Sequence, residues 1–150
     1  MTFSPPAPAI ATMRTYPTLQ DIVEAQERLK PHIKHTPLLR AEKMEKDVGC
    51  QLYLKPETLQ ITGAFKIRGA LNKALSMPKE EIANGIIATS SGNHGQGLAY
   101  AARMLGVKAF LVLPMTTPKI KIANTKALGA EVILFDGDTA ARWKKGYEIA

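Results

Sequence analysis

The stretch that decides the fold is IIATSSGNHGQGL, residues 86–98, in which three apolar residues precede a polar loop rich in glycine. After the loop, apolar residues recur at the spacing i, i+3, i+4 and i+7, which places them on one face of a helix. These positions are Leu98, Ala101, Ala102 and Leu105. Gly106 follows them, and glycine is common just after a helix end. The stretch therefore predicts a strand, a loop and a helix in that order.

Two more strands follow with a helix between them. The apolar runs 109–113 and 132–135 lack the alternation of half-exposed strands, which predicts strands covered on both faces. Between them, Thr117 is predicted to cap a helix with Pro118 at its first position, and Gly129 to end it. This alternation predicts an α/β fold, a parallel sheet with helices on both faces. In such sheets the ligand site lies beyond the carboxyl ends of the strands.

The first 65 residues follow a different pattern. Residues 1–16 contain three prolines within the first eight positions and predict a flexible leader. Thr18 is then predicted to cap an amphipathic helix that ends before Pro31. A second short helix is expected to end at Gly49, and residues 52–54 predict a short strand.

The last helix is expected to begin at Asp138 or Thr139, either of which can cap it. It continues through Trp143 and Tyr147, and no glycine or proline follows Tyr147 to end it. We therefore expect the chain to stop within an element.

Composition narrows the classes of function. The chain has 150 residues, 45% hydrophobic and 22% charged, which is typical of a globular domain. Its net charge of +7 is spread over single lysines and arginines rather than one basic block, so nucleic acid is not an expected partner. No apolar run approaches the roughly 18 residues of a membrane span, and no signal peptide is visible, so no membrane partner is expected.

Cysteine and histidine usage predicts neither a disulfide nor a metal site. Cys50 is the only cysteine, which favours a reducing cytoplasm as the location. His32 and His35 lack a carboxylate or thiol at metal-binding spacing, so we assign no metal.

The loop after residue 88 has the composition of an anion site. Its glycines at 92, 95 and 97 are expected to free successive backbone N–H groups beside a helix N-terminus, where a carboxylate or phosphate can bind. Polar side chains that add donors are Ser90, Ser91, Asn93, His94 and Gln96. The order G-x-x-G-x-G differs from the dinucleotide pattern G-x-G-x-x-G. The alternative is a glycine-rich turn whose polar residues only cap the helix.

Lys66 is the second candidate for chemistry. An apolar helical stripe begins just after Thr62 with Ile67 and Ala70, so Lys66 is expected in the opening turn of a helix. The positive end of a helix disfavours an ammonium, and burial beside Phe65 would act in the same direction. A neutral amine is the form that condenses with carbonyls. The alternative is that Lys66 merely flanks the stripe in solvent, as most lysines do.

The two segments together resemble a known family. Residues 55–70, KPETLQITGAFKIRGA, followed by 90–97, SSGNHGQG, closely resemble the fold type II pyridoxal-phosphate enzymes, in particular threonine and serine dehydratases and serine racemases. Residues 35–40, HTPLLR, are similar to an early segment of the same family. The resemblance implies the tryptophan synthase beta-like fold, present here in truncated form.

The resemblance also implies roles for individual residues. Lys66 would bind pyridoxal 5′-phosphate as a Schiff base and act as a catalytic base, Phe65 would pack near the cofactor ring, and Asn93 would bind its 3-hydroxyl. Ser90, Ser91, Gly92, Asn93 and His94 would bind the substrate carboxylate. Ser91 is also a catalytic candidate, because in racemases of this family a serine at this position can serve the opposite face of the substrate.

The implied reaction is β-elimination of L-threonine or L-serine to a 2-oxo acid and ammonia. Two alternatives are racemisation of serine and a non-catalytic α/β fragment that only binds a small ligand. The implied domains are an incomplete large cofactor domain over 17–65 and a small α/β domain over 66–150, in an enzyme that forms a homo-oligomer. The family's glycine run for the cofactor phosphate has no counterpart before Ala150. We therefore expect the isolated chain to bind the cofactor weakly and to turn over little.

Overall fold

The computed structural model describes residues 16–149. Within that range the helices and strands, in chain order, are α1 Leu19–Leu29, β1 Leu39–Arg40, α2 Glu42–Val48, β2 Tyr53–Leu54, the 3-10 helix η1 Glu57–Leu59, α3 Lys66–Ser76, α4 Lys79–Ile82, β3 Ile86–Ala88, α5 Asn93–Leu105, β4 Ala109–Pro114, α6 Lys119–Ala127, β5 Glu131–Phe135 and α7 Thr139–Ile149. The predicted leader, residues 1–16, lies almost entirely outside the described residues.

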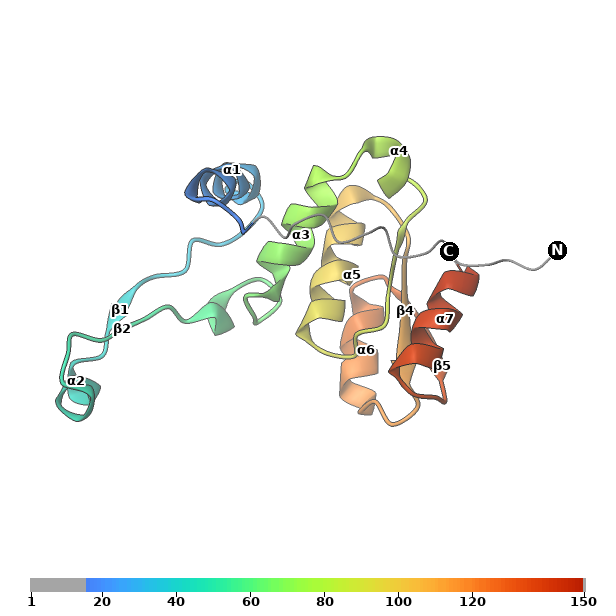
Figure 1. Ribbon diagram of the computed structural model, residues 1–150. Helices are drawn as coiled ribbons and strands as arrows, with labels where there is room; N and C mark the ends of the chain where they lie inside the picture. The colour runs from blue at the N-terminus through green and yellow to red at the C-terminus, as the bar shows by residue number, and fades with distance from the viewer. Residues whose placement is uncertain (1–15, 150) are drawn as a thin grey trace.

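A three-stranded parallel sheet forms the centre of the second half of the chain. Its order is β3-β4-β5, with Ile86 opposite Ala109 and Phe110 opposite Glu131. Figure 1 shows α5 and α6 on one side of the sheet and α7 on the other. The predicted α/β fold, with a parallel sheet and helices on both faces, is confirmed.

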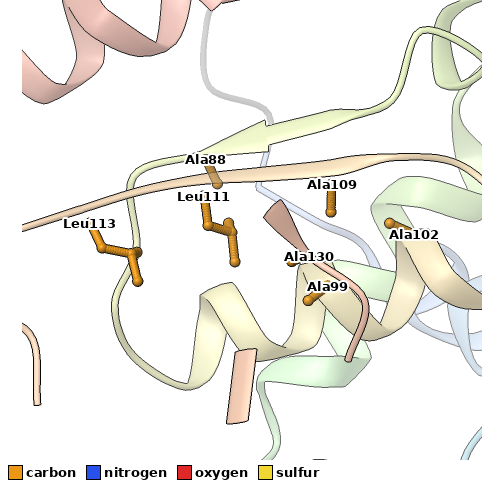
Figure 2. Close-up of a cluster of buried hydrophobic side chains, with 7 residues drawn as sticks. All are labelled: Ala88, Ala99, Ala102, Ala109, Leu111, Leu113 and Ala130. Atoms are coloured by element: carbon orange, nitrogen blue, oxygen red, sulfur yellow. The ribbon is translucent and has the colours of Figure 1, made fainter. Parts of the chain in front are cut away.

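The main core lies between the sheet and α5. Small residues of α5 allow close approach to the branched side chains of β4, as Figure 2 shows. The cluster consists of Ala88, Ala99, Ala102, Ala109, Leu111, Leu113 and Ala130. Complete cover on both faces holds only for β4, because most residues of β3 and β5 are partly exposed. The prediction for the edge strands was wrong because an apolar run does not reveal which strand is central.

A second core joins α3 to α5. Ile67, Leu71 and Ala74 of α3 are buried with Ala101 of α5 and with Leu29 at the end of α1. The amphipathic face predicted for α3 is therefore the face that packs on α5. This contact places the helix that begins at Lys66 directly beside the helix that follows the polar loop.

Residues 37–59 form an arm that extends away from both cores. Antiparallel β1 and β2 pair within it, with Leu39 opposite Leu54. Figure 1 shows the pair, with α2 at the outer end of the two strands, at the far side of the molecule from β5. Every residue from 37 to 59 is at least partly exposed.

The helix ends confirm some of the predicted caps and correct others. Thr18 and Asp21 form a complete capping box at α1, and Asp138 caps α7 by accepting a hydrogen bond from Ala141 N–H (2.8 Å). Thr117 is not the cap of α6: the N-cap position is Pro118, and the Thr117 side chain is buried. Pro118 has an extended backbone (φ −55°, ψ 136°), so it lies outside the helix and α6 begins one residue later than predicted.

Candidate active site

Lys66 is the first residue of α3, as the apolar stripe predicted. The turn before it requires glycine, because Gly63 has φ +67°, and its N–H donates to the Gln60 carbonyl (2.8 Å). The chain then enters the helix through Phe65 with no side-chain cap. The amine of Lys66 is therefore attached to the positive end of α3.

The predicted burial of Lys66 beside Phe65 was wrong. Both side chains are exposed, and the Phe65 ring is 57% exposed. The two are nevertheless in contact, with Lys66 Nζ 5.0 Å from the centre of the Phe65 ring. Local sequence could not predict this exposure, because burial depends on elements that pack from elsewhere.

The polar loop is shorter than predicted. Helix α5 begins at Asn93 rather than near Leu98, so only Thr89, Ser90, Ser91 and Gly92 lie between β3 and the helix. Gly92 is the N-cap, with no side-chain cap, and its N–H donates to Ser90 Oγ (3.4 Å). Apolar periodicity missed the first helical turn because that turn, NHGQG, carries polar residues and glycines.

Gly95 and Gly97 are helical residues rather than loop residues, which corrects their predicted role. A Cβ on Gly95 would lie 2.1 Å from the Ser90 carbonyl oxygen. A Cβ on Gly97 would lie 3.3 Å from the backbone nitrogen of Ile67. These glycines let the loop close onto α5 and let the first turn of α3 touch α5.

Asn93 and His94 occupy the first two positions of α5, where both are exposed. The first N–H groups of a helix have no acceptor within the helix, and the first intrahelical bond here runs from Gln96 N–H to the Gly92 carbonyl. The positive end of α5 therefore presents backbone donors beside the side chains of both residues. This arrangement suits a carboxylate or phosphate.

A pocket of about 470 Å³ connects the two motifs. It lies between the end of β2, the turn before α3 and the start of α5, and its lining includes Glu57, Gly63, Phe65 and Asn93. Lys66, Ser90, Ser91, Gly92 and His94 are absent from the lining of this pocket. The structure thus places Phe65 with Asn93, whereas Lys66 and the serine loop flank them.

Sequence reasoning missed a hydrogen-bonded cluster of Thr36, Glu57 and Arg68, which we call the Thr36–Glu57–Arg68 cluster. Arg68 Nε and Nη2 donate to Glu57 Oε2 and Oε1, both at 2.8 Å, and the Thr36 hydroxyl donates to Glu57 Oε1 (2.6 Å). Thr36 is only 2% exposed. Each of the three residues lies in a segment that resembles the fold type II enzymes. Sequence periodicity could not reveal the cluster, because the residues come from three separate elements.

Acid should weaken this cluster. Hydrogen bonds from Arg68 are the main cause that lowers the pKa of Glu57 from its usual 4.5 to about 2. A carboxyl whose pKa is lower in the folded chain stabilises the fold above pH 4.5, and the contribution is lost as the pH falls toward 2.

We expect Glu57→Gln to flatten the dependence of the unfolding free energy on pH between about 4.5 and 2. The effect should be about 1 to 2 kcal/mol, because the pair is partly exposed to solvent. Urea unfolding at several pH values measures it. Equal slopes for the variant and the unaltered chain in this range would contradict the expectation.

No metal or membrane feature appears in the described part of the chain. Between residues 16 and 149, no three side chains of His, Cys, Asp or Glu are grouped as metal ligands. None of the helices in the same range is long and apolar enough to cross a bilayer.

Comparison with known proteins assigns the family. The family model described as pyridoxal-phosphate dependent enzyme matches residues 29–150. The chain belongs to this family. The matched region includes α3 with Lys66, the polar loop and the start of α5.

Individual family members agree with this assignment. L-threo-3-hydroxyaspartate ammonia-lyase of Saccharomyces cerevisiae is 38% identical over 89% of this chain and 41% of its own length. L-threonine ammonia-lyase of Thermotoga maritima is 47% identical over 78% of this chain and 29% of its own length. The crystal structure of serine racemase from Dictyostelium discoideum matches with a TM-score of 0.83 and 39% identity, over 88% of this chain and 43% of that one.

The chain spans less than half the length of the curated relatives it matches. The comparison with solved structures gives the same result, because the matched region is 43% of the serine racemase chain. The activities and substrates of these full-length family members are therefore proposals for this chain.

The residues of this chain fit pyridoxal phosphate, the cofactor in the name of the family. A pocket of about 470 Å³ is within the usual size of small-molecule sites, and an aromatic ring and an amide side chain line it. An exposed primary amine follows Phe65 directly, and the uncapped end of α5 offers backbone donors to an anion. The close approach at Gly95 and Gly97 keeps these groups together.

Proposed function

We propose that the chain forms the lysine-bearing part of a pyridoxal-phosphate-dependent ammonia-lyase. Its substrates are L-threonine, L-serine or both, and its products are a 2-oxo acid and ammonia. One observation carries the proposal: Ile67 N, the atom bonded to the Lys66 carbonyl carbon, lies 3.3 Å from the Cβ position of Gly97. The backbone at the start of α3, which carries Lys66, is thus in direct contact with α5. Relatives of the chain, such as the L-threonine ammonia-lyases of Thermotoga maritima and Geobacter sulfurreducens, supply the reaction class.

The proposal gives each candidate residue a task. Lys66 holds the cofactor, and Phe65 and Asn93 contact its ring from the wall of the pocket. The serine loop and the first turn of α5 (Ser90, Ser91, Gly92, Asn93 and His94) bind the substrate carboxylate. When bound, the cofactor supplies an electron sink for charge that develops at the substrate α carbon. The Lys66 amine, freed when the substrate binds, accepts the proton that leaves that carbon.

Domain division and assembly are part of the same proposal. We place the boundary between residues 65 and 66, so that 17–65 belongs to a large cofactor domain and 66–150 to a small α/β domain. The exposure of every residue from 37 to 59 supports a division for that part of the range, because those residues pack on neither core. Within 17–65, Leu29 does pack against α3. We also propose that the enzyme is a homo-oligomer and that its location is the cytoplasm.

Reductive trapping and product assays test the function together. The chain is incubated with pyridoxal 5′-phosphate, reduced with borohydride and digested, and the modified peptide is identified by mass. We expect the label on Lys66, at less than one per chain, and slow ammonia release from L-threonine or L-serine. Labelling spread evenly over the lysines, with no ammonia from either amino acid, would contradict the proposed function. The chain would then be a non-catalytic fragment that only binds a small ligand.

A second activity, racemisation of serine, has one observation in its favour. Ser91 lies immediately before the N-cap of α5, in a chain that resembles a serine racemase structure with a TM-score of 0.83. Racemisation needs a proton donor on the substrate face opposite Lys66, and a serine hydroxyl can supply that proton. We expect D-serine to form from L-serine and Ser91→Ala to remove that product while ammonia release continues. Chiral chromatography of the reaction mixture measures both products.

A further inference from the structure

The start of α3 is held from two directions. The Cβ position of Gly97 lies 3.3 Å from Ile67 N, so the backbone of α5 supports the first turn of α3 at Ile67. One residue further on, Arg68 leaves the same turn and reaches Glu57 in η1 with two hydrogen bonds of 2.8 Å. Lys66 lies two residues before Arg68 in this turn. A helical turn that is fixed at adjacent residues in two directions cannot rotate about its own axis.

In the Thr36–Glu57–Arg68 cluster, both Glu57 oxygens and the Thr36 hydroxyl have hydrogen-bond partners. Each Glu57 oxygen accepts from Arg68, and Oε1 also accepts from the Thr36 hydroxyl. Arg68 Nη2 also donates a weak hydrogen bond to the Thr36 hydroxyl oxygen Oγ1 (3.4 Å). Lys55 Nζ donates to the Thr36 carbonyl (2.9 Å). The planar fork of arginine matches a carboxylate in one geometry, so the cluster specifies orientation as well as charge.

The cluster also separates two pockets. Glu57 lines the pocket of about 470 Å³ that contains Phe65 and Asn93, whereas Arg68 lines a second pocket of about 620 Å³ beside α1. Lys55 lines both. Glu57 is thus part of the wall of the candidate cofactor pocket, and its partner Arg68 lies two residues after Lys66 on the chain.

We propose that the Thr36–Glu57–Arg68 cluster is a positioning device that orients the first turn of α3 and thereby the Lys66 amine. The inference rests on the proposed function, in which that amine holds the cofactor. Glu57 and Arg68 are positioning residues in this account, because they act through the helix and not on the substrate. Their task is to keep the amine beside the pocket wall, over the Phe65 ring.

The chain contains a matched control pair. Arg40 Nε and Nη2 donate to Glu45 Oε1 and Oε2, both at 2.9 Å, with the same forked geometry. The Glu45 side chain is 18% exposed and the Glu57 side chain 17%. The Arg40–Glu45 pair lies in the arm formed by β1 and α2, in neither pocket lining. Variants of the Arg40–Glu45 pair therefore show the effect of losing a forked ion pair that does not contact α3.

Trace acetylation tests the orientation of the Lys66 amine in the absence of the cofactor. The folded chain is treated with limiting acetic anhydride, and the acetylated fractions of Lys66 and Lys73 are measured by mass. Both lysines are exposed and lie at opposite ends of α3, so the ratio of their reactivities cancels any change in overall stability. We expect Arg68→Lys and Glu57→Gln to shift this ratio toward the value of the unfolded chain in guanidinium. Arg40→Lys and Glu45→Gln should leave it unchanged.

Trapping with pyridoxal 5′-phosphate and borohydride is the second readout. We expect the rate of labelling at Lys66 to fall on the order of tenfold in Arg68→Lys, because small displacements of a reacting group have effects of that size or larger. Arg68→Lys keeps the charge and loses the fork, so a role for charge alone predicts no change. Far-UV circular dichroism checks that each variant is folded. If Arg68→Lys unfolds, Thr36→Val replaces it, because it keeps the ion pair and removes one hydroxyl.

The two proposals fail in different ways. If the unaltered chain is not labelled at Lys66, the proposed function fails, while the acetylation ratio still tests the positioning role. If Lys66 is labelled but the cluster variants match the Arg40 and Glu45 variants in ratio and in rate, the positioning role is wrong.

Discussion

Replacing Lys66 by alanine should abolish reductive labelling of α3 by pyridoxal 5′-phosphate. The label requires a primary amine that condenses with the aldehyde, and the substituted helix has none at that position. Lys66 is exposed at the start of α3, so its truncation should change stability by no more than about 0.5 kcal/mol. Loss of the label can therefore not be attributed to unfolding. Peptide mapping after borohydride reduction measures it.

Lys73 provides the control for this experiment. It lies in the last turn of the same helix, at the end opposite Lys66, and is also exposed. Lys73→Ala should keep the label on the peptide that contains Lys66. A label that survives Lys66→Ala, or one that disappears in Lys73→Ala, would show that another amine carries the cofactor.

Replacing Gly95 by alanine should destabilise the chain by about 2 to 4 kcal/mol. The new Cβ would lie 2.1 Å from the Ser90 carbonyl oxygen, and Leu111 Cδ1 is 3.5 Å away. The nearest atom belongs to the backbone, so the loop after β3 has to move as a unit. The displaced residues include Ser90 and Ser91, so substrate binding should be lost together with stability. Urea unfolding followed by circular dichroism measures the change in stability.

Gly69 is the matched control because it also lies inside a helix. No atom lies within 4 Å of the Cβ position of Gly69, whereas Gly95 is confined by the loop. Alanine is the better helix former, so Gly69→Ala should stabilise the chain by about 0.5 to 1 kcal/mol. Opposite signs for the two substitutions are the expected result. A stabilised Gly95→Ala variant would mean that the close approach between α5 and the loop is wrong.

Much of the fold could be predicted because its signals are local. Branched apolar runs located β3, β4 and β5, and the periodicity of α3 placed Lys66 at the start of a helix. Turn residues located helix ends, as Gly49 and Gly106 show with φ of +70°. The candidate site followed from a family resemblance in two segments of sequence. The burial of the edge strands and the first turn of α5 were mispredicted, because there the deciding contacts come from other elements.

The sequence by itself determined the order of the elements from β3 to α7, the family and the amine that the proposal depends on, since each is encoded within a few neighbouring residues. Only the tertiary structure decided that Gly97 meets Ile67 and that Arg68 reaches Glu57 and Thr36. Such contacts join residues from 11 to 32 positions apart in the ion-pair cluster, and no local pattern records them. Their physical basis is packing between separate elements, which fixes orientation only after the chain has folded.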